Sequence, residues 1–444
     1  MLATHISLGE KAGRPGYEAD NPMNQKQAPH TSQSRFQASA IPAGALTGIR
    51  VLDLSRVLAG PFSAQTLADL GADVIKIERP KGGDDSRAWG PPFMPDSNGN
   101  ASGESTYFHS VNRGKRSVTV DIAHPDGQAL IRKLALQCDV LIENYKVGTL
   151  DRYGLGYEDL HTLHPGLVYC SITGFGQTGP YRARPGYDTI VQAMGGLMSI
   201  TGEPDREPQR IGVAVIDVMT GLYATIAVLG ALMNRHRTGV GQRIDLALLD
   251  VQFAGLANMG MNYLATGEVP KRTGNINLTV QPSGVFSCSD GQLMMIVGNN
   301  GQFQSLCKVL SLDQLARDAR FASNALRVNN FQALHAVINA AFTQRPLAEW
   351  LAALETAKIP AGPINDIAQA FADPHVQERG AVIELEHETL GRIPTIANPI
   401  RYSDTNVRYQ RPSPLLSQHT QEVLGELLGL NAETVKDLAR RGIV

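Results

Sequence analysis

Asp217 is the residue whose type and surroundings most directly suggest chemistry. It lies in the segment RIGVAVIDVMTGLYATIAVLGALMNRHRTGVGQ (210–242), where an apolar, strand-like stretch ends in a single carboxylate and a long apolar helix begins. A carboxylate at such a junction can serve as a fixed nucleophile that the positive end of the helix holds ionised. Aspartate is also among the favoured residues for capping a helix N-terminus, so the local sequence by itself favours a cap.

A second pattern is the glycine-rich run GFGQTG (174–179), which follows a predicted strand. It matches the GxGxxG pattern of dinucleotide-binding loops, but such a site also needs a helix that opens at the last glycine and an acid about 20 residues further on. Here the segment PYRARPGYD (180–188) follows, with two prolines. The glycines therefore indicate a loop that approaches a ligand, and a nicotinamide oxidoreductase is not favoured.

The first half of the chain alternates between strand-like and helix-like segments. Predicted helices over 62–70 and 125–137 separate short apolar runs, a pattern typical of a parallel sheet covered on both faces. We therefore predict the α/β class, with a doubly wound, Rossmann-like large domain. The strand-like runs are 50–54, 73–78, 117–121, 139–144 and 167–173.

From about residue 263 the character of the sequence changes. The segment GVFSCSDGQLMMIVG (284–298) predicts a hairpin, and helical periodicity follows over 302–356. The turn signal IPAGPIND (359–366) comes next, a second hairpin is predicted over 382–396, and two helices near 419–430 and 432–441 close the chain. The predicted organisation is a disordered extension over 1–45, a large domain over 46–269, an inserted smaller α+β domain over 270–356 and a return to the large domain over 357–444.

Composition excludes several classes of function. The 444 residues carry a net charge of -2, which gives no electrostatic footprint for nucleic acid or for an anionic membrane. No stretch approaches 18 uninterrupted apolar residues, so we expect no membrane-spanning segment. The four cysteines form no CxxC pair and predict buried, reduced thiols of a cytoplasmic protein; they are Cys138, Cys170, Cys288 and Cys307.

The polar N-terminal segment leaves the cellular location open. Residues 1–45 are rich in Gln, Ser, Ala and Pro, which predicts the disordered extension. Residues 23–50 are basic and free of acids, so a mitochondrial transit peptide is an alternative to a cytoplasmic location. A misassigned start codon would give the same pattern.

Several motifs in order carry a resemblance to a known family. They are LTGIRVLDLSRVLAGPFSAQTLADLGADVIKIERPKGGDD (46–85), NRGKRSVTVDI (112–122), DVLIENYKVGTLDRYGLGYEDL (139–160), YCSITGFGQTGPY (169–181), GYDTIVQAMGGLMSITGE (186–203), RIGVAVIDVMTGLYA (210–224), IPAGPIND and PLLSQHTQEVL (414–424). With this set the chain resembles the class III CoA-transferases, the formyl-CoA transferase-like family that includes α-methylacyl-CoA racemases. It looks especially similar to the dicarboxylate branch, of the succinate–hydroxymethylglutarate CoA-transferase type.

The resemblance implies a fold, an activity and a set of site residues. It implies an interlocked homodimer, coenzyme A as acyl-carrying substrate without a metal or redox cofactor, and Asp217 as the catalytic nucleophile. Arg79 and Arg152 suit the phosphates of CoA, because a guanidinium offers forked donors to phosphate oxygens. The CoA-binding residues implied are Val57, Leu58 and Ala59 beside the pantetheine, Arg79, Asn144, Tyr145 and Arg152, with Tyr187 and Asp188 lining the acyl or pantetheine site and Lys115 and Arg116 as further basic candidates.

Two departures from the family patterns narrow the activity. Racemase members pair the aspartate with a histidine before the Asp of the GxD segment, and this chain has Tyr187 there. A phenol, with an ordinary pKa of about 10, is a poor base at neutral pH, so a transferase is favoured over the alternative racemase. The run KRTGNINLTVQPSG (271–284) lacks the consecutive glycines of formyl-CoA transferases.

The sequence thus predicts an acyl-CoA:carboxylate CoA-transferase that moves CoA from succinyl-CoA to a small dicarboxylic acid. Arg56 and Arg272 are the candidates for pairing the distal carboxylate of that acid. A CoA-binding protein without catalytic activity is the third alternative, and binding of CoA without acyl exchange would distinguish it.

Overall fold

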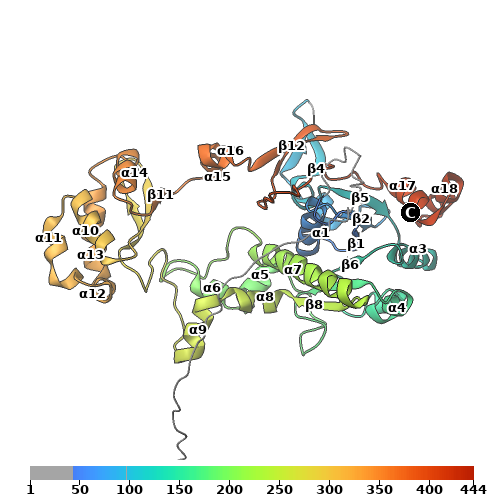
Figure 1. Ribbon diagram of the computed structural model, residues 1–444, viewed down its shortest axis with the longest axis horizontal. Helices are drawn as coiled ribbons and strands as arrows, with labels where there is room; N and C mark the ends of the chain where they lie inside the picture. Colours follow the sequence, from blue (N-terminus) through green and yellow to red (C-terminus); the bar gives the residue numbers. More distant parts are fainter. Residues whose placement is uncertain (1–43, 97) are drawn as a thin grey trace, which may run out of the picture. The chain divides into compact units, whose positions relative to one another are not determined.

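The computed structural model describes residues 44–96 and 98–444, and its largest sheet has six parallel strands (Figure 1). The predicted N-terminal extension lies, except for residues 44 and 45, outside the described residues. All five pairings between neighbouring strands are parallel, which confirms the α/β class. In spatial order the strands are β5 (Lys115–Thr119), β2 (Asp73–Glu78), β1 (Arg50–Asp53), β6 (Val140–Glu143), β7 (Val168–Thr173) and β8 (Arg243–Ala247).

Helices cover both faces of this sheet, which explains why every residue of β5 and β6 is buried. Successive residues of a strand point to opposite faces, so Val51 packs into one core and Leu52 into the other. The core that contains Leu52 is completed by α3 (Pro125–Ala135), α4 (Tyr157–Leu163), α17 (Thr420–Leu428) and α18 (Ala432–Arg440). The core that contains Val51 is completed by α1 (Ala59–Asp69), α7 (Val215–Thr238) and α8 (Leu248–Gly255).

The strand order places a reversal between β1 and β6. From β1 the chain continues to β2 on one side, whereas β6, on the other side of β1, is followed by β7 and β8. Connections that leave the carboxyl ends of two such strands diverge, and the crevice between them is the usual ligand site of open α/β sheets. The fold therefore directs the search for a site to the loops after β1 and β6.

Helix α7 begins two residues before Asp217, at Val215, and residues 210–214 form no strand. The predicted strand-to-helix junction is therefore wrong in detail, and the residue at the N-cap is Ala214. The helix ends at Thr238, and the C-cap residue Gly239 has a φ of 76°, a left-handed conformation that glycine adopts without strain. Within the described residues α7 is the one helix long and apolar enough to cross a membrane by length and composition, a test that core helices also pass.

A second, antiparallel sheet has its own core in the second half of the chain. It consists of β9 (Ser283–Ser287), β10 (Gln292–Ile296) and β11 (Ala361–Pro363), so the predicted hairpin over 284–298 is confirmed. Strand β11 pairs with β10 although it lies beyond the predicted boundary at residue 356, and the sheet therefore takes in the chain as far as Pro363. The helices of this region are α10 (Asn300–Val309), α11 (Asp313–Arg317), α12 (Asn324–Asn329), α13 (Phe331–Phe342) and α14 (Leu347–Thr356).

The remaining elements are short. The second predicted hairpin is confirmed as β12 (Val382–His387) and β13 (Gly391–Ile396). A small hairpin of β3 (Phe93–Pro95) and β4 (Ala101–Ser105) leads into α2 (Thr106–Val111). The other helices are α5 (Asp188–Met194), α6 (Leu197–Ile200), α9 (Ala257–Thr266), α15 (Ile367–Ala372) and α16 (Pro374–Glu378), with 3-10 turns at Asp85–Ala88, Asp151–Tyr153 and Ala319–Phe321.

The four cysteines are free and buried, as predicted. In the part of the chain that the structure describes, no group of three His, Cys, Asp or Glu side chains is arranged to hold a metal ion.

Candidate active site

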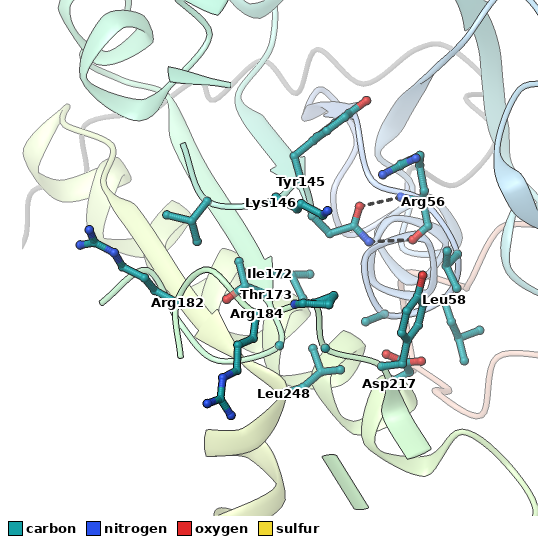
Figure 2. Close-up of a pocket in the computed structure, with 18 of the residues that line it drawn as sticks. Arg56, Leu58, Tyr145, Lys146, Ile172, Thr173, Arg182, Arg184, Asp217 and Leu248 are labelled. Atoms are coloured by element: carbon teal, nitrogen blue, oxygen red, sulfur yellow. Dashed lines mark hydrogen bonds between the residues drawn. The ribbon is translucent and has the colours of Figure 1, made fainter. Parts of the chain in front are cut away.

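A pocket lies at the carboxyl ends of β1, β6 and β7, where the strand order predicts a ligand site, and Asp217 is part of its wall (Figure 2). Its other walls come from the turn between β1 and α1, the segment after β6 and the glycine-rich loop after β7. The lining residues are Arg56, Val57, Leu58, Ala59, Asp85, Asn144, Tyr145, Lys146, Val147, Ile172, Thr173, Gly174, Arg182, Ala183, Arg184, Pro185, Gly186, Tyr187, Asp217 and Leu248.

Asp217 occupies the first turn of α7, partly buried at the pocket wall. Burial, and then the charge of Asp188, raise the pKa of Asp217 to about 7. The expectation that the positive end of the helix holds this carboxylate ionised is therefore wrong. A carboxyl group whose pKa lies near neutral is more basic than an ordinary aspartate, and its ionised form is a better nucleophile.

Asp188 contributes after burial, and its carboxylate also takes the backbone N–H groups at the start of α7. Its Oδ2 accepts hydrogen bonds from the N–H of Ile216 at 2.7 Å and from the N–H of Asp217 at 3.2 Å. Asp188 is buried and does not line the pocket, whereas the preceding Tyr187 does. The structure thus corrects the expectation that Asp188 contacts the ligand.

The turn after β1 is held in a strained shape beside Asp217. Val57 has a φ of 72°, an uncommon conformation for a β-branched residue. Its N–H donates to both carboxylate oxygens of the buried Asp84, at 3.2 and 3.3 Å, and Lys76 donates to Asp84 at 2.9 Å. Burial by itself would raise the pKa of Asp84, but the Lys76 ammonium holds it well below its usual range. A buried ion pair therefore fixes the strained backbone at the pocket wall.

Asn144 braces the same turn from β6. Its Oδ1 accepts from the N–H of Arg56 at 2.9 Å and its Nδ2 donates to the carbonyl of Arg56 at 2.7 Å, as the dashed lines in Figure 2 show. Both polar atoms of the amide are thus bound to backbone. The predicted residues from the turn and from β6 come together in the pocket, and Asn144 shapes it.

Arg56 and Arg79 meet at Asp85. Arg56 Nη1 donates to Asp85 Oδ2 at 3.0 Å, and Arg79 Nη2 donates to Asp85 Oδ1 at 2.5 Å. The Arg56 guanidinium lies 5.0 Å from the ring centre of Tyr145, and its buried Nε has no hydrogen-bond partner among the described residues. Arg56 and Asp85 line the pocket, whereas Arg79 reaches it only through Asp85.

Four other predicted residues lie away from this pocket. Arg152 is in an exposed 3-10 turn, and Arg272 donates to the carbonyls of Glu203, Pro204 and Arg206. Lys115 is fully buried and binds Asp53, Asn112 and the carbonyl of Pro61, while Arg116 is paired with Asp73, Glu422 and Glu426. Lys115 and Arg116 are therefore engaged in ion pairs of the protein itself.

Three basic residues of the pocket escaped the sequence analysis. Lys146 follows Asn144 and Tyr145, while Arg182 and Arg184 lie on the loop between β7 and α5. Arg184 stacks on Tyr181 at 3.9 Å from the ring centre, and neither arginine has a carboxylate partner among the described residues. The signal was the RAR sequence (182–184) shortly after the glycine-rich run, which we interpreted only as part of a loop that approaches a ligand.

A parallel sheet with a partly buried carboxyl group of raised pKa and several cations at its switch point is an arrangement suited to acyl transfer from an anionic thioester. The family description "CoA-transferase family III" matches residues 46–420, and the chain belongs to that family. It is a class III CoA-transferase.

Individual relatives agree with this assignment. Succinate–glutarate CoA-transferase of Agrobacterium fabrum is 51% identical over 383 residues, which are 86% of this chain and 95% of that protein. Succinyl-CoA:glutarate CoA-transferase of Mus musculus is 45% identical over 399 residues, 90% of each chain. The crystal structure of a CAIB/BAIF family protein from Brucella suis superposes with a TM-score of 0.78 at 48% identity, covering 87% of this chain and all of that one.

Proposed function

We propose that this enzyme transfers CoA from succinyl-CoA to a small dicarboxylic acid of about the size of glutarate, with Asp217 as covalent carrier. The observation that carries the proposal is the Asp217 carboxylate in the wall of a pocket that also contains Arg56, Lys146, Arg182 and Arg184. The names of the relatives support the donor and the acceptor class, because they include succinyl-CoA with glutarate, D-citramalate and mesaconate.

The proposed chemistry uses the carboxylate twice. Asp217 attacks the thioester carbonyl, the C–S bond breaks, and an aspartyl–succinyl anhydride and CoA thiolate form. The thiolate then attacks the aspartyl carbonyl, which releases succinate and leaves an aspartyl-CoA thioester. The acceptor carboxylate runs the same steps in reverse, so that each difficult exchange is divided into easier ones. We assign stabilisation of the oxyanions to backbone N–H groups of Leu58, Ala59 and Gly174, which line the pocket, because the N–H of Val57 is already bound to Asp84.

We assign the CoA phosphates to the basic residues at the mouth of the site. Lys146 lines the pocket, and Arg79 is 52% exposed beside it with Asp85 as its partner. Arg152, in an exposed 3-10 turn away from this pocket, keeps its predicted phosphate role as part of this proposal. An exposed guanidinium or ammonium can pair with phosphate without the desolvation that a buried site would impose.

Distal-carboxylate recognition is assigned to the arginines of the pocket. Arg56 has an unsatisfied buried Nε, and Arg182 and Arg184 are available for an anion. Arg272 is bound to backbone carbonyls and does not line this pocket, so its predicted role remains to be tested by substitution. A site that leaves an arginine unpaired when the second carboxylate is missing discriminates against monocarboxylates.

The racemase alternative is not favoured by any feature of the site. The position beside Asp217 that would need a histidine base holds Tyr187, which lines the pocket with 63% of its surface exposed. Exchange of the α-hydrogen of a chiral 2-methylacyl-CoA in deuterated buffer would nevertheless reveal such an activity.

We further propose that a second copy of the chain covers the exposed face of α7. We also propose that the small domain is inserted between the two parts of the large domain, as the family resemblance implies. Contiguous apolar patches of this kind mark protein interfaces. Light scattering after gel filtration should give twice the monomer mass; a monomer that binds lipid vesicles would overturn this. The exposed apolar side chains are Leu222, Tyr223, Ile226 and Met233 on α7, Phe253 on α8, and Met261 and Leu264 on α9.

Two experiments test the proposed activity. Succinyl-CoA is incubated with a panel of mono- and dicarboxylates, and new acyl-CoA species are identified by mass spectrometry; we expect C4–C6 dicarboxylates to be the best acceptors. Hydroxylamine trapping should modify the peptide that contains Asp217. An unmodified peptide together with rates that require a ternary complex would refute the covalent route.

A cytoplasmic location stays a prediction, which imaging of a fluorescent fusion in the source cell tests.

A further inference from the structure

The N-terminus of α7 is capped by a residue from a different helix. The first N–H groups of a helix lack partners within it, and a side chain at the N-cap usually accepts from one or two of them. Ala214 stands at the N-cap of α7 and has no side chain to do this. The carboxylate of Asp188, on α5, accepts from the N–H of Ile216 and of Asp217 instead.

The capping carboxylate is itself fixed. Gln192, one turn further along α5 and fully buried, donates from its Nε2 to Asp188 Oδ1 at 2.5 Å. The Oε1 of the same amide accepts from the N–H of Ile211 at 3.0 Å. Asp188 and Gln192 thus hold both ends of the segment that leads from Ile211 into α7, and Asp188 is only 6% exposed.

This arrangement determines which carboxylate the positive end of α7 stabilises. The N–H groups that would favour a negative charge at Asp217 are already bound to the carboxylate of Asp188. Asp217 is left beside a like charge with its own backbone N–H committed. Its carboxylate therefore remains more basic than the first turn of a helix normally allows.

We propose that Asp188 is a positioning residue for Asp217: it fixes the backbone of the nucleophile, and its negative charge keeps the Asp217 carboxylate basic and reactive. The proposal rests on the proposed function, in which Asp217 carries the acyl group. It reassigns Asp188 from ligand contact to control of the nucleophile, while the adjacent Tyr187 faces the pocket.

Other charged and titratable groups surround Asp217. One of them is Tyr107 on α2, whose pKa is raised to about 12 by burial and then by the charges of Asp217 and Asp188. Among all these groups Asp188 is the one whose charge adds to burial in raising the pKa of Asp217 to about 7. The groups across the pocket are Arg56, Asp85, Tyr145, Lys146, Arg182, Arg184 and Tyr187.

The test compares Asp188→Asn, which keeps an acceptor oxygen but removes the charge, with the wild-type enzyme in succinyl-CoA:dicarboxylate exchange. We expect kcat at pH 8 to fall by about 10- to 100-fold with KM for succinyl-CoA unchanged. The acidic limb of the kcat/KM profile should move down by about one pH unit. The variant should therefore lose less activity at pH 6 than at pH 8, a pattern that loss of stability does not produce.

Two further variants make the result decisive. Asp188→Glu retains the charge, so its acidic limb should stay at the wild-type position even where kcat is reduced. Asp373→Asn is the matched control, because Asp373 caps α16 by accepting from the N–H of His375 at 2.8 Å and of Val376 at 3.2 Å. It should leave both kcat and the pH profile unchanged.

Three results would overturn the proposal. A raised KM with an unchanged pH profile would make Asp188 a ligand-binding residue, and lowered thermal stability with unchanged kinetics would make it a structural cap. If Asp188→Asn does not fold, Gln192→Met, which removes only the donor to Oδ1, must lower kcat without raising KM; unchanged kcat would refute positioning. Failure of the proposed function is distinguishable, because there Asp217→Ala would itself remain active.

Discussion

The raised pKa of Asp217 predicts that activity and stability respond to pH in opposite directions. The nucleophile must be ionised, and with a pKa of about 7 the ionised fraction rises from about one tenth at pH 6 to about nine tenths at pH 8. We therefore expect kcat/KM for succinyl-CoA to increase about ninefold over this range. An ordinary aspartate, with a pKa of 3.8, would give a flat profile.

The same shift costs stability as pH rises. Between pH 3.8 and about 7 the folded protein binds the proton at Asp217 and the unfolded chain does not, so the free energy of unfolding falls with increasing pH. A shift of about three units corresponds to at most about 4 kcal/mol. Because Asp217 is partly exposed to the pocket, solvent reduces this, and we expect about 1–2 kcal/mol to be lost between pH 5 and pH 8.

The assay compares urea unfolding of the wild type with that of Asp217→Asn at each pH, at one protein concentration. The difference between the two proteins isolates Asp217 from other groups that titrate in this range, notably Glu143, whose pKa burial raises to about 7. Asp217→Asn should be the more stable protein at pH 8 and should lose this advantage toward pH 5. A pH-independent difference, together with a flat kcat/KM profile from pH 6 to 8, would refute the reasoning.

Three further predictions concern the substrate groups. Asp217→Ala should reduce exchange to below a few percent of wild type while leaving CoA binding by calorimetry within about twofold, because the residue acts in the covalent steps and the CoA phosphates are assigned to other residues. Dicarboxylates should exceed monocarboxylates of equal length by about 10²-fold in kcat/KM. The Arg56→Met variant should lose that preference, whereas the exposed control Arg392→Met should retain it. If Arg56→Met retains the preference, recognition of the distal carboxylate belongs to Arg182, Arg184 or Arg272. Arg79→Met should weaken CoA more than dephospho-CoA if Arg79 pairs with the 3′-phosphate, and equal weakening would contradict that assignment.

The elements that sequence predicts well here are those whose residues are buried on both faces. Strand β2 has the predicted bounds of 73–78, because every residue after Asp73 is buried and three of those five residues, in the pattern VIKI, are β-branched and apolar. Strand β8 was not predicted. It lies at the edge of the sheet, where its segment RIDLA carries two charged residues at exposed positions between less exposed apolar ones. The hairpin of β3 and β4 was missed for a similar reason, because Gly and Ser in ASGES carry little strand preference.

The site residues could be predicted where sequence motifs identify them, and could not where contacts between distant segments determine their role. Motif order placed Asp217, the Val57–Ala59 turn and Asn144 together, and the fold brings them to one pocket. Arg272 was chosen from a shortened loop, and nothing in its neighbourhood along the chain shows that backbone carbonyls take its donors. Contacts between segments far apart in sequence decide which basic residues remain available for a substrate.

The electrostatics of Asp217 show why the sign of an effect can escape sequence reasoning. Helix position by itself predicts an acidic carboxyl group, since the first turn carries partial positive charge. The structure reverses the sign first because the Asp217 carboxyl group is buried, and second because the charge of Asp188, 29 residues away, lies beside it and takes the N–H groups of Ile216 and Asp217. A carboxylate that were fully stabilised there would be a weak nucleophile and a good leaving group. The Asp217 carboxylate remains basic at a cost in protein stability, and its basicity favours the anhydride step. The cap that Asp188 forms on α7 is in this way linked to the chemistry of the pocket.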